Sequence, residues 1–260
     1  MSPIAIPCSI VTWPMLPRMS DRFHEYAGTE LELFAGAGNW KSYWADMIRP
    51  YLSGRVLEVG AGIGSNIPLL HGDSISGWTA IEPDDRLASE IRRKRDDGLL
   101  PASCDIVTGT VADLADGLEY DTILYIDVLE HIPGDAEELR RAARHLAPGG
   151  HLIVLSPAHQ YLFSPFDAAI GHVRRYSRQG LVRLAPPSCR LMSVRMLDCA
   201  GFFLSLANRA IMRSSMPTQS QIAVWDRFFV PVSRCLDGLL AFRFGKTVVA
   251  VWRKAPSANR

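Results

Sequence analysis

The sequence has no excess of charge of either sign. Its 28 lysines and arginines nearly balance 27 aspartates and glutamates, which leaves a formal net charge of +1. A protein whose main partner is nucleic acid usually carries a domain-wide basic field that attracts phosphates. We therefore expect no nucleic acid partner for this chain.

Cysteines are few and scattered. There are five, an odd number, and no two of them are spaced as C-x-x-C: Cys8, Cys104, Cys189, Cys199 and Cys235. Disulfide frameworks and structural zinc sites need cysteines that are paired at short spacing. We expect free thiols in a reducing compartment, and hence a cytoplasmic protein.

Long apolar runs are also missing. The chain has no stretch of eighteen uninterrupted apolar residues, so we expect no stable membrane insertion. Its first 17 residues are apolar, but they contain four prolines and follow no basic segment. Prolines at this density prevent a continuous helix, so we predict an irregular arm rather than a signal peptide.

Apolar runs alternate with charged, amphipathic segments from residue 54 onwards. The runs predict strands at 55–59, 78–82, 104–109, 120–126 and 151–156. The intervening segments predict helices at 65–70, 84–97 and 135–147, the last closed by Pro148, Gly149 and Gly150. Apolar strands that alternate with helices are typical of an α/β fold with a parallel sheet covered on both faces.

The remaining sequence divides the chain into four parts. Residues 1–53 hold the arm and amphipathic helices rich in aromatic residues, and 54–198 form an α/β core. Residues 199–243 hold two apolar helical stretches, and 244–260 begin with a closing strand. A polar, aromatic segment, 157–188, interrupts the alternation just before the last strand of the core, predicted at 189–197.

Residues 54–66 read GRVLEVGAGIGSN, a strand followed by three glycines at every second position. Such a loop exposes backbone N–H groups at the carboxyl edge of the sheet, where open α/β folds bind ligands. A dinucleotide fingerprint would need its third glycine at position 65, which is a serine. Glu58 would repel a pyrophosphate but suits an ammonium group, so a nicotinamide-dependent dehydrogenase is disfavoured.

A second acidic residue, Glu82, ends the predicted strand 78–82, eighteen positions after Gly64. A carboxylate at the tip of the second strand is placed to accept both hydroxyls of a ribose. The two acidic positions together indicate a nucleoside ligand that also carries an ammonium group.

Five ordered motifs between residues 54 and 156 resemble those of the class I S-adenosylmethionine-dependent methyltransferases. They read VLEVGAGIGSN, AIEPD, GTVADL, YDTILYIDVLEHI and LAPGGHLIVLSP. The resemblance implies a Rossmann-like, seven-stranded, mostly parallel sheet with strand order 3-2-1-4-5-7-6. It also implies an N-terminal helical lid, here with Tyr26 and Asn39 facing the cofactor, and a helical insert before the last strand.

The same resemblance implies S-adenosylmethionine as the cofactor and assigns residues to it. Glu58 and the three glycines would hold its methionine part, Glu82 would hold its ribose, and Asp127 would lie close to its ammonium group. The full implied set is Glu58, Gly60, Gly62, Gly64, Asn66, Glu82, Pro83, Asp84, Thr110, Val111, Asp127 and Tyr26. Thr110 departs from the family pattern, because many members carry an aspartate there.

The candidates for acceptor chemistry cluster in the segment 157–188. The run D-x-x-x-G-H-x-R-R-Y resembles a segment of a subset of these enzymes. It suggests His172 as a base and Tyr176 as an orienting group, with Asp167 as a third catalytic candidate. The arginines at 174 and 175 would bind an anion. Alternatively, Asp167 pairs with one of these arginines and fixes the loop.

Glu130 and His131 follow the fourth predicted strand and face the same edge. A metal site needs more ligands in fixed geometry, so we expect no metal and a structural role for His131. The insert 199–243 would cap the acceptor pocket, form a homodimer face or contact a membrane. The cap is favoured, because basic residues are not gathered on one face.

These patterns predict transfer of the methyl group of S-adenosylmethionine to a small-molecule acceptor, in secondary metabolism. The cofactor is already electrophilic, so the alignment of acceptor and methyl group supplies much of the effect, and no catalytic triad is needed. Two alternatives stay open. One is attack at another sulfonium carbon, by intramolecular cyclisation or aminocarboxypropyl transfer, with release of methylthioadenosine. The other is a non-catalytic binding module.

Overall fold

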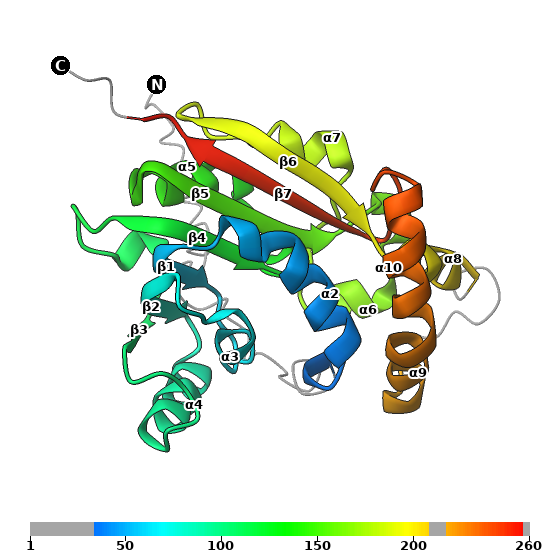
Figure 1. Ribbon diagram of the computed structural model, residues 1–260, viewed down its shortest axis with the longest axis horizontal. Helices are drawn as coiled ribbons and strands as arrows, with labels where there is room; N and C mark the ends of the chain where they lie inside the picture. Colours follow the sequence, from blue (N-terminus) through cyan, green and yellow to red (C-terminus); the bar gives the residue numbers. More distant parts are fainter. Residues whose placement is uncertain (1–33, 208–216, 257–260) are drawn as a thin grey trace, which may run out of the picture.

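Seven strands lie side by side in one sheet, in the order β3-β2-β1-β4-β5-β7-β6 (Figure 1). The computed structural model describes residues 34–207 and 217–256. The strands are β1 (Gly54–Val59), β2 (Ile75–Glu82), β3 (Cys104–Thr108), β4 (Tyr120–Ile126), β5 (Leu146–Pro157), β6 (Cys189–Leu197) and β7 (Thr247–Lys254). The first five are parallel, and β7 is antiparallel to both of its neighbours. The predicted α/β class and strand order are confirmed.

Helices cover both faces of this sheet (Figure 1). They are α2 (Gly38–Ile48), η2 (Arg49–Tyr51), α3 (Ile67–Leu70), α4 (Asp85–Asp96), η3 (Val111–Asp113), η4 (Leu129–His131), α5 (Asp135–Arg144), η5 (Gln160–Leu162), α6 (Pro165–Ala169), α7 (Arg178–Val182), α8 (Cys199–Ala207), α9 (Gln219–Val224), the π-helix η7 (Trp225–Phe229) and α10 (Val230–Leu239). Consecutive strand residues point to opposite faces. Ile123 and Leu124 accordingly belong to separate buried clusters.

Strand β5 is longer than its sequence predicts. Helix α5 ends at Arg144 and β5 begins at Leu146, so the segment 148–150 lies inside the strand instead of closing a helix. A Cβ atom at Gly150 would lie 2.8 Å from the carbonyl oxygen of Asp121 and 2.9 Å from that of Ala147. Glycine is therefore required at position 150 because two backbone carbonyls approach it closely. In the sequence alone, the same glycine indicates a turn.

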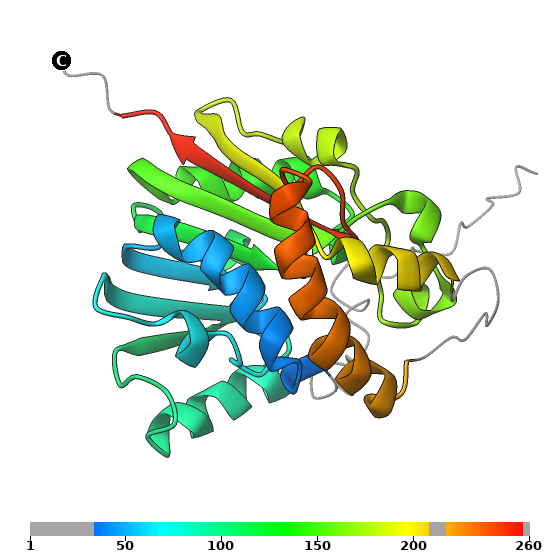
Figure 2. The same cartoon turned by 45° about the vertical axis from the view of Figure 1, so that its right-hand side comes forward.

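Buried aspartates attach the insert to the first described helix. The backbone N–H of Trp40 in α2 donates to Asp226 at 2.8 Å, and the hydroxyl of Tyr43 donates to Asp237 at 2.8 Å. Asp237 also accepts from the N–H groups of Asp198 and Cys199, which begin the insert. Helices α10 and α2 accordingly run alongside each other (Figure 2). Among the described residues, no helix is long and apolar enough to cross a membrane.

The Asp237 anchor leads to a stability prediction. The substitution Asp237→Ala leaves the Tyr43 hydroxyl and two N–H groups without their acceptor in a fully buried place. We expect the free energy of unfolding to fall by about 3 kcal/mol, because unpaired buried donors keep their full desolvation cost. Urea unfolding measures the change. Asp116→Ala, an exposed control, should stay within about 0.5 kcal/mol of the parent, and an equal effect of both variants would contradict the role of the anchor.

Candidate active site

A large cavity opens at the carboxyl ends of β1, β2, β4 and β5. Its volume is about 2280 Å³, and its walls include the glycine loop, the tip of β2, the segment 162–175 and the insert helices. Pockets for single small ligands commonly measure several hundred cubic ångströms. The cavity therefore has room for a nucleoside cofactor together with a second molecule.

The glycines of this loop are required by its backbone conformation and by the side chains packed behind it. Gly60, Gly62 and Gly64 have φ values of 65°, 57° and 72°, a left-handed conformation that favours glycine. A Cβ atom at Gly60 would lie 2.7 Å from a methyl group of Val128, and one at Gly64 would lie 3.3 Å from Ile91. The spacing noted in the sequence thus reflects a tight turn wedged against neighbouring side chains, with Gly60 and Gly62 on the cavity wall.

Glu82 lies at the tip of β2, buried beneath the loop and on the wall of the cavity. Its carboxylate accepts from the N–H of Gly62 at 2.8 Å and from the N–H of Asp84 at 3.0 Å. Burial raises the pKa of Glu82, and these two hydrogen bonds oppose the shift. The carboxylate is thereby fixed in place, and Pro83 and Asp84 line the wall beside it.

Glu58 is placed differently from its expected role. It does not belong to the described wall of the cavity; it lies under the loop, where it accepts from the Asn66 amide at 2.9 Å and from the Trp78 indole at 3.2 Å. Burial raises its pKa to about 7, against the pull of these donors and of Lys41. Asn66 does reach the wall, so Glu58 is separated from the cavity by one hydrogen-bonded side chain.

Three charged groups converge on the floor of the cavity. Asp127 follows β4 with a φ of 54° and faces the cavity. The Asp127 side chain is exposed to the cavity, where its distance from bulk solvent raises its pKa, while His172, Lys246 and Lys41 lower it. Both lysines line the cavity, and desolvation lowers the pKa of each.

The two lysines were missed by sequence reasoning. Lys41 donates to the Ser65 hydroxyl at 2.9 Å, and the ammonium of Lys246 lies 3.8 Å from the ring centre of Trp225. The chain has 24 arginines and only four lysines, at 41, 94, 246 and 254. Their rarity does not single out the two that line the cavity, because Lys94 and Lys254 instead donate to backbone carbonyls.

The remaining expected cofactor residues differ in their placement. Thr110 lines the cavity, and its hydroxyl accepts from the N–H of Ala112 to begin η3. Val111 is buried in the core and is not part of the described cavity wall. Asn39 points to the insert, where its amide donates to Asp226 at 3.2 Å. Tyr26 lies outside the described residues.

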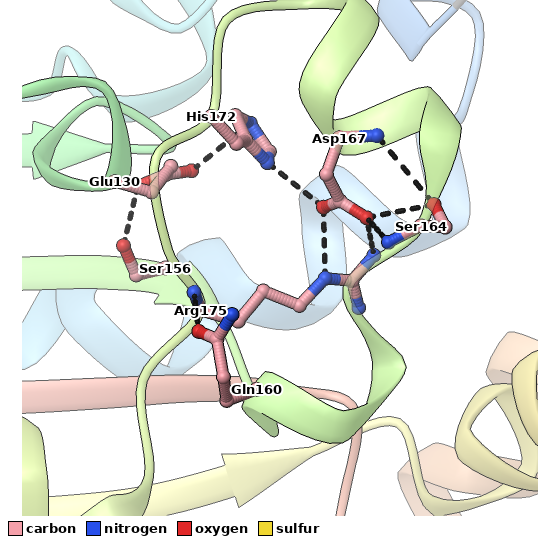
Figure 3. A network of polar contacts seen from close by, with 7 residues as sticks. All are labelled: Glu130, Ser156, Gln160, Ser164, Asp167, His172 and Arg175. Atoms are coloured by element: carbon pink, nitrogen blue, oxygen red, sulfur yellow. Dashed lines mark hydrogen bonds and ion pairs between the residues drawn. The ribbon is translucent and has the colours of Figure 1, made fainter.

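Asp167 is the centre of a polar network on the opposite wall (Figure 3). It accepts from two nitrogens of Arg175, both at 2.8 Å, from Nδ1 of His172 at 2.9 Å and from the Ser164 hydroxyl at 2.7 Å. Burial alone would raise the pKa of Asp167, but the bonds from His172 and Arg175 hold it well below its usual range. Of the two expected arginine partners, Arg175 binds Asp167, and Arg174 instead pairs with Asp135.

Tyr176 does not belong to the described wall of the cavity. Its side chain is buried, and its hydroxyl donates to Asp135 at 2.9 Å. Burial and this carboxylate raise the pKa of Tyr176. The backbone of Tyr176 pairs with that of Ala158, so the residue joins the segment after β5 to the one that carries His172.

Glu130 and His131 lie beside His172 at the end of β4. The Glu130 carboxylate is fully buried, and burial raises its pKa well above its usual range. The rings of His131 and His172 meet edge to face with their centres 4.6 Å apart. Burial and the neighbouring His172 lower the pKa of His131 to about 4, so its ring is neutral at pH 7.

Comparison with known proteins identifies the family. The methyltransferase domain family matches residues 20–186, and the chain belongs to that family. A comparison with curated proteins found no match.

Solved structures with the same fold include a candidate sarcosine dimethylglycine methyltransferase from Galdieria sulphuraria, with 15% identity, a TM-score of 0.57, and coverage of 83% of this chain and 86% of that one. They also include the [4+2]-cyclase SpnF, with 16% identity, a TM-score of 0.57, and coverage of 88% and 95%. A third is coclaurine N-methyltransferase bound to N-methylheliamine and S-adenosylhomocysteine, with 13% identity, a TM-score of 0.57, and coverage of 82% and 72%. At such low identity these likenesses show the fold alone.

Membership of the methyltransferase domain family makes this chain an S-adenosylmethionine-dependent transferase, with S-adenosylmethionine as its cofactor. The cavity fits that cofactor. Glu82 is a fixed acceptor at the tip of β2, Asp127 is an acid that faces the cavity, and Gly60 and Gly62 expose backbone without side chains at the wall. These groups match a ribose, an ammonium and a close backbone approach, respectively.

The packing behind Gly60 predicts a loss of cofactor binding on substitution. Gly60→Ala would combine a left-handed backbone with a clash against Val128, so the loop has to move. We expect affinity for S-adenosylmethionine to fall at least about tenfold, equivalent to about 1.4 kcal/mol, by titration calorimetry. The control Gly72→Ala, which meets nothing within 4 Å, should bind normally; unchanged binding by Gly60→Ala would contradict a tightly wedged loop.

The burial of Glu58 predicts a pH-dependent stability. Its pKa is about 7 in the folded chain against 4.5 as the ordinary value, so the folded state binds more protons between these values. The stabilisation is complete below pH 4.5 and is lost as the pH rises through 7, a difference of about 3 kcal/mol. Urea unfolding from pH 5 to 8 should show this decline in the parent and a flatter profile in Glu58→Gln. The exposed control Glu119→Gln should keep the parental slope.

Proposed function

We propose that this protein transfers the methyl group of S-adenosylmethionine to a small-molecule acceptor in secondary metabolism. One observation carries the proposal: the cavity continues from the glycine loop and Glu82 to a second wall made by the segment 162–175 and the insert. A cofactor on the first wall therefore has room for an acceptor before it. A chain that used the cofactor as its own substrate would have no need of that second wall.

Aromatic side chains line the acceptor half of the cavity. The Phe34 ring lies 6.4 Å from those of Phe166 and Trp225, centre to centre, and all three residues are on the wall. Stacked and edge-on rings favour flat, apolar ligands. We infer an acceptor with an apolar, planar part, covered by the insert 199–243 acting as a cap.

The polar end of the acceptor would face His172. Its Nδ1 is held by Asp167, which leaves Nε2 available, and the residue lies on the cavity wall near Asp127. An acceptor hydroxyl or amine that must lose a proton would do so there. Tyr176, which lies behind this wall, would be a positioning residue for the segment that carries His172.

The alternative function, a non-catalytic binding module, is supported by the exposed apolar surface of the insert. Phe203, Phe228 and Leu239 are 60%, 59% and 83% exposed, which would also suit a homodimer. The same insert contributes Leu204, Ile222 and other side chains to the cavity wall. Because the insert both lines the cavity and exposes an apolar surface, we favour an enzyme whose insert covers the cavity. A non-catalytic binding module would need only the exposed surface.

Product analysis tests the proposed reaction. Purified protein incubated with S-adenosylmethionine alone should bind it and leave it intact. A panel of small aromatic phenols and amines should then yield S-adenosylhomocysteine and a methylated product, detected by mass spectrometry. Steady formation of methylthioadenosine without any acceptor would contradict methyl transfer and favour cyclisation or aminocarboxypropyl transfer.

Variants separate the acceptor wall from the cofactor wall. His172→Ala should lower turnover about 100-fold, the usual scale of a lost proton-transfer group, while cofactor affinity stays within about threefold. The matched control is His151→Ala, which removes a half-buried histidine that meets the Tyr51 ring edge to face, and it should keep its turnover. Equal losses in the two variants would argue against a specific role for His172.

A further inference from the structure

Three potential metal ligands meet beside the cavity: His131 and His172 line its wall, and Glu130 is buried behind them. Glu130 and His131 come from η4, just after β4, and His172 comes from the segment after α6. One ligand atom of each lies within 4.8 Å of the others. Two imidazoles and one carboxylate form a ligand set that binds divalent transition metals and leaves positions open for other molecules.

Glu130 supplies an independent sign of a missing partner. Its side chain is fully buried; Oε2 accepts from the Ser156 hydroxyl, but Oε1 has no hydrogen-bond partner among the residues that the structure describes. The nearest charged group, Nε2 of His172, is 3.7 Å away, beyond hydrogen-bond distance (Figure 3). Buried polar atoms are rarely left unsatisfied, so this oxygen is aimed at something that belongs between the three residues.

Both histidines are oriented in the manner of metal ligands. Nδ1 of His172 bonds to the carboxylate of Asp167 at 2.9 Å, and the His131 ring bonds to the backbone of Gly171. A histidine that donates from one ring nitrogen keeps a lone pair on the other, which is the arrangement that supports coordination. For His172 this leaves Nε2, the atom that faces Glu130.

A simple ion pair explains the cluster less well. The 3.7 Å gap between Nε2 and Oε1 is long for a pair inside the protein, and it leaves Oε1 without a hydrogen bond. The nearby cation, Arg175, is occupied by two hydrogen bonds to Asp167. A bound cation would use all three residues and satisfy Oε1.

We propose that Glu130, His131 and His172 bind one divalent transition-metal cation at the wall of the cavity. Asp167 positions His172 for this bond. The metal site is inferred from geometry alone, whereas its use in catalysis rests on the proposed function. An open coordination position would hold an acceptor oxygen and favour its deprotonated form. His172 then serves as a ligand, and Asp127 lies on the same side of the cavity.

Cobalt titration of the full-length, metal-stripped protein tests the site. Co²⁺ should bind at one equivalent per chain, with visible absorption bands of nitrogen and oxygen ligands and without the thiolate bands that cysteine would produce. Glu130→Gln, His131→Ala and His172→Ala should each weaken binding at least about 100-fold. Asp167→Asn should weaken it about 10- to 100-fold, as the loss of an orienting carboxylate does.

Two controls keep the result interpretable. His151→Ala should bind Co²⁺ like the parent, and each variant should still bind S-adenosylmethionine, which shows that it is folded. Absence of Co²⁺ binding, thiolate bands, or parental affinity in the three ligand variants would overturn the proposal. Failure to bind S-adenosylmethionine by the parent would instead count against the proposed function, so the two failures are distinguishable.

Discussion

The reversal of strand order between β1 and β4 is the constraint on which the site depends. The chain leaves β1 toward β2 on one side, and β4 lies on the other side of β1. The loops after β1 and β4 therefore diverge and leave a crevice at the carboxyl edge. Gly60, Glu82 and Asp127 all reach the cavity because their strands end at this crevice.

Burial determines how the charges at this edge behave. Each buried carboxylate is costly unless donors or cations compensate it, and the chain meets this requirement in different ways. Asp167 is bound by an arginine and a histidine, and Glu58 by an amide and an indole. Glu130 has a hydrogen-bond donor on one carboxylate oxygen alone, and its other oxygen belongs to the cluster that Glu130 forms with the two histidines.

The insert joins stability to function through its buried anchors. Asp198 accepts from the Trp225 indole at 2.8 Å and pairs with Lys246, and Trp225 and Lys246 both line the cavity. The aspartates that attach the helices to the sheet therefore also set the shape of the cap. Changes in these anchors are expected to affect the acceptor half of the cavity more than the glycine loop, which other contacts hold.

The sequence by itself determined the layers and, through its ordered motifs, the strand order, because period-two and helical patterns are local properties of the chain. Only the tertiary structure decided which side chains meet. It buried Val111 and Tyr176, turned Asn39 to the insert, and brought Lys41 and Lys246 into the cavity. It also placed His172 against Glu130 and His131. Contacts between distant segments depend on how whole elements pack, and no local spacing encodes that packing.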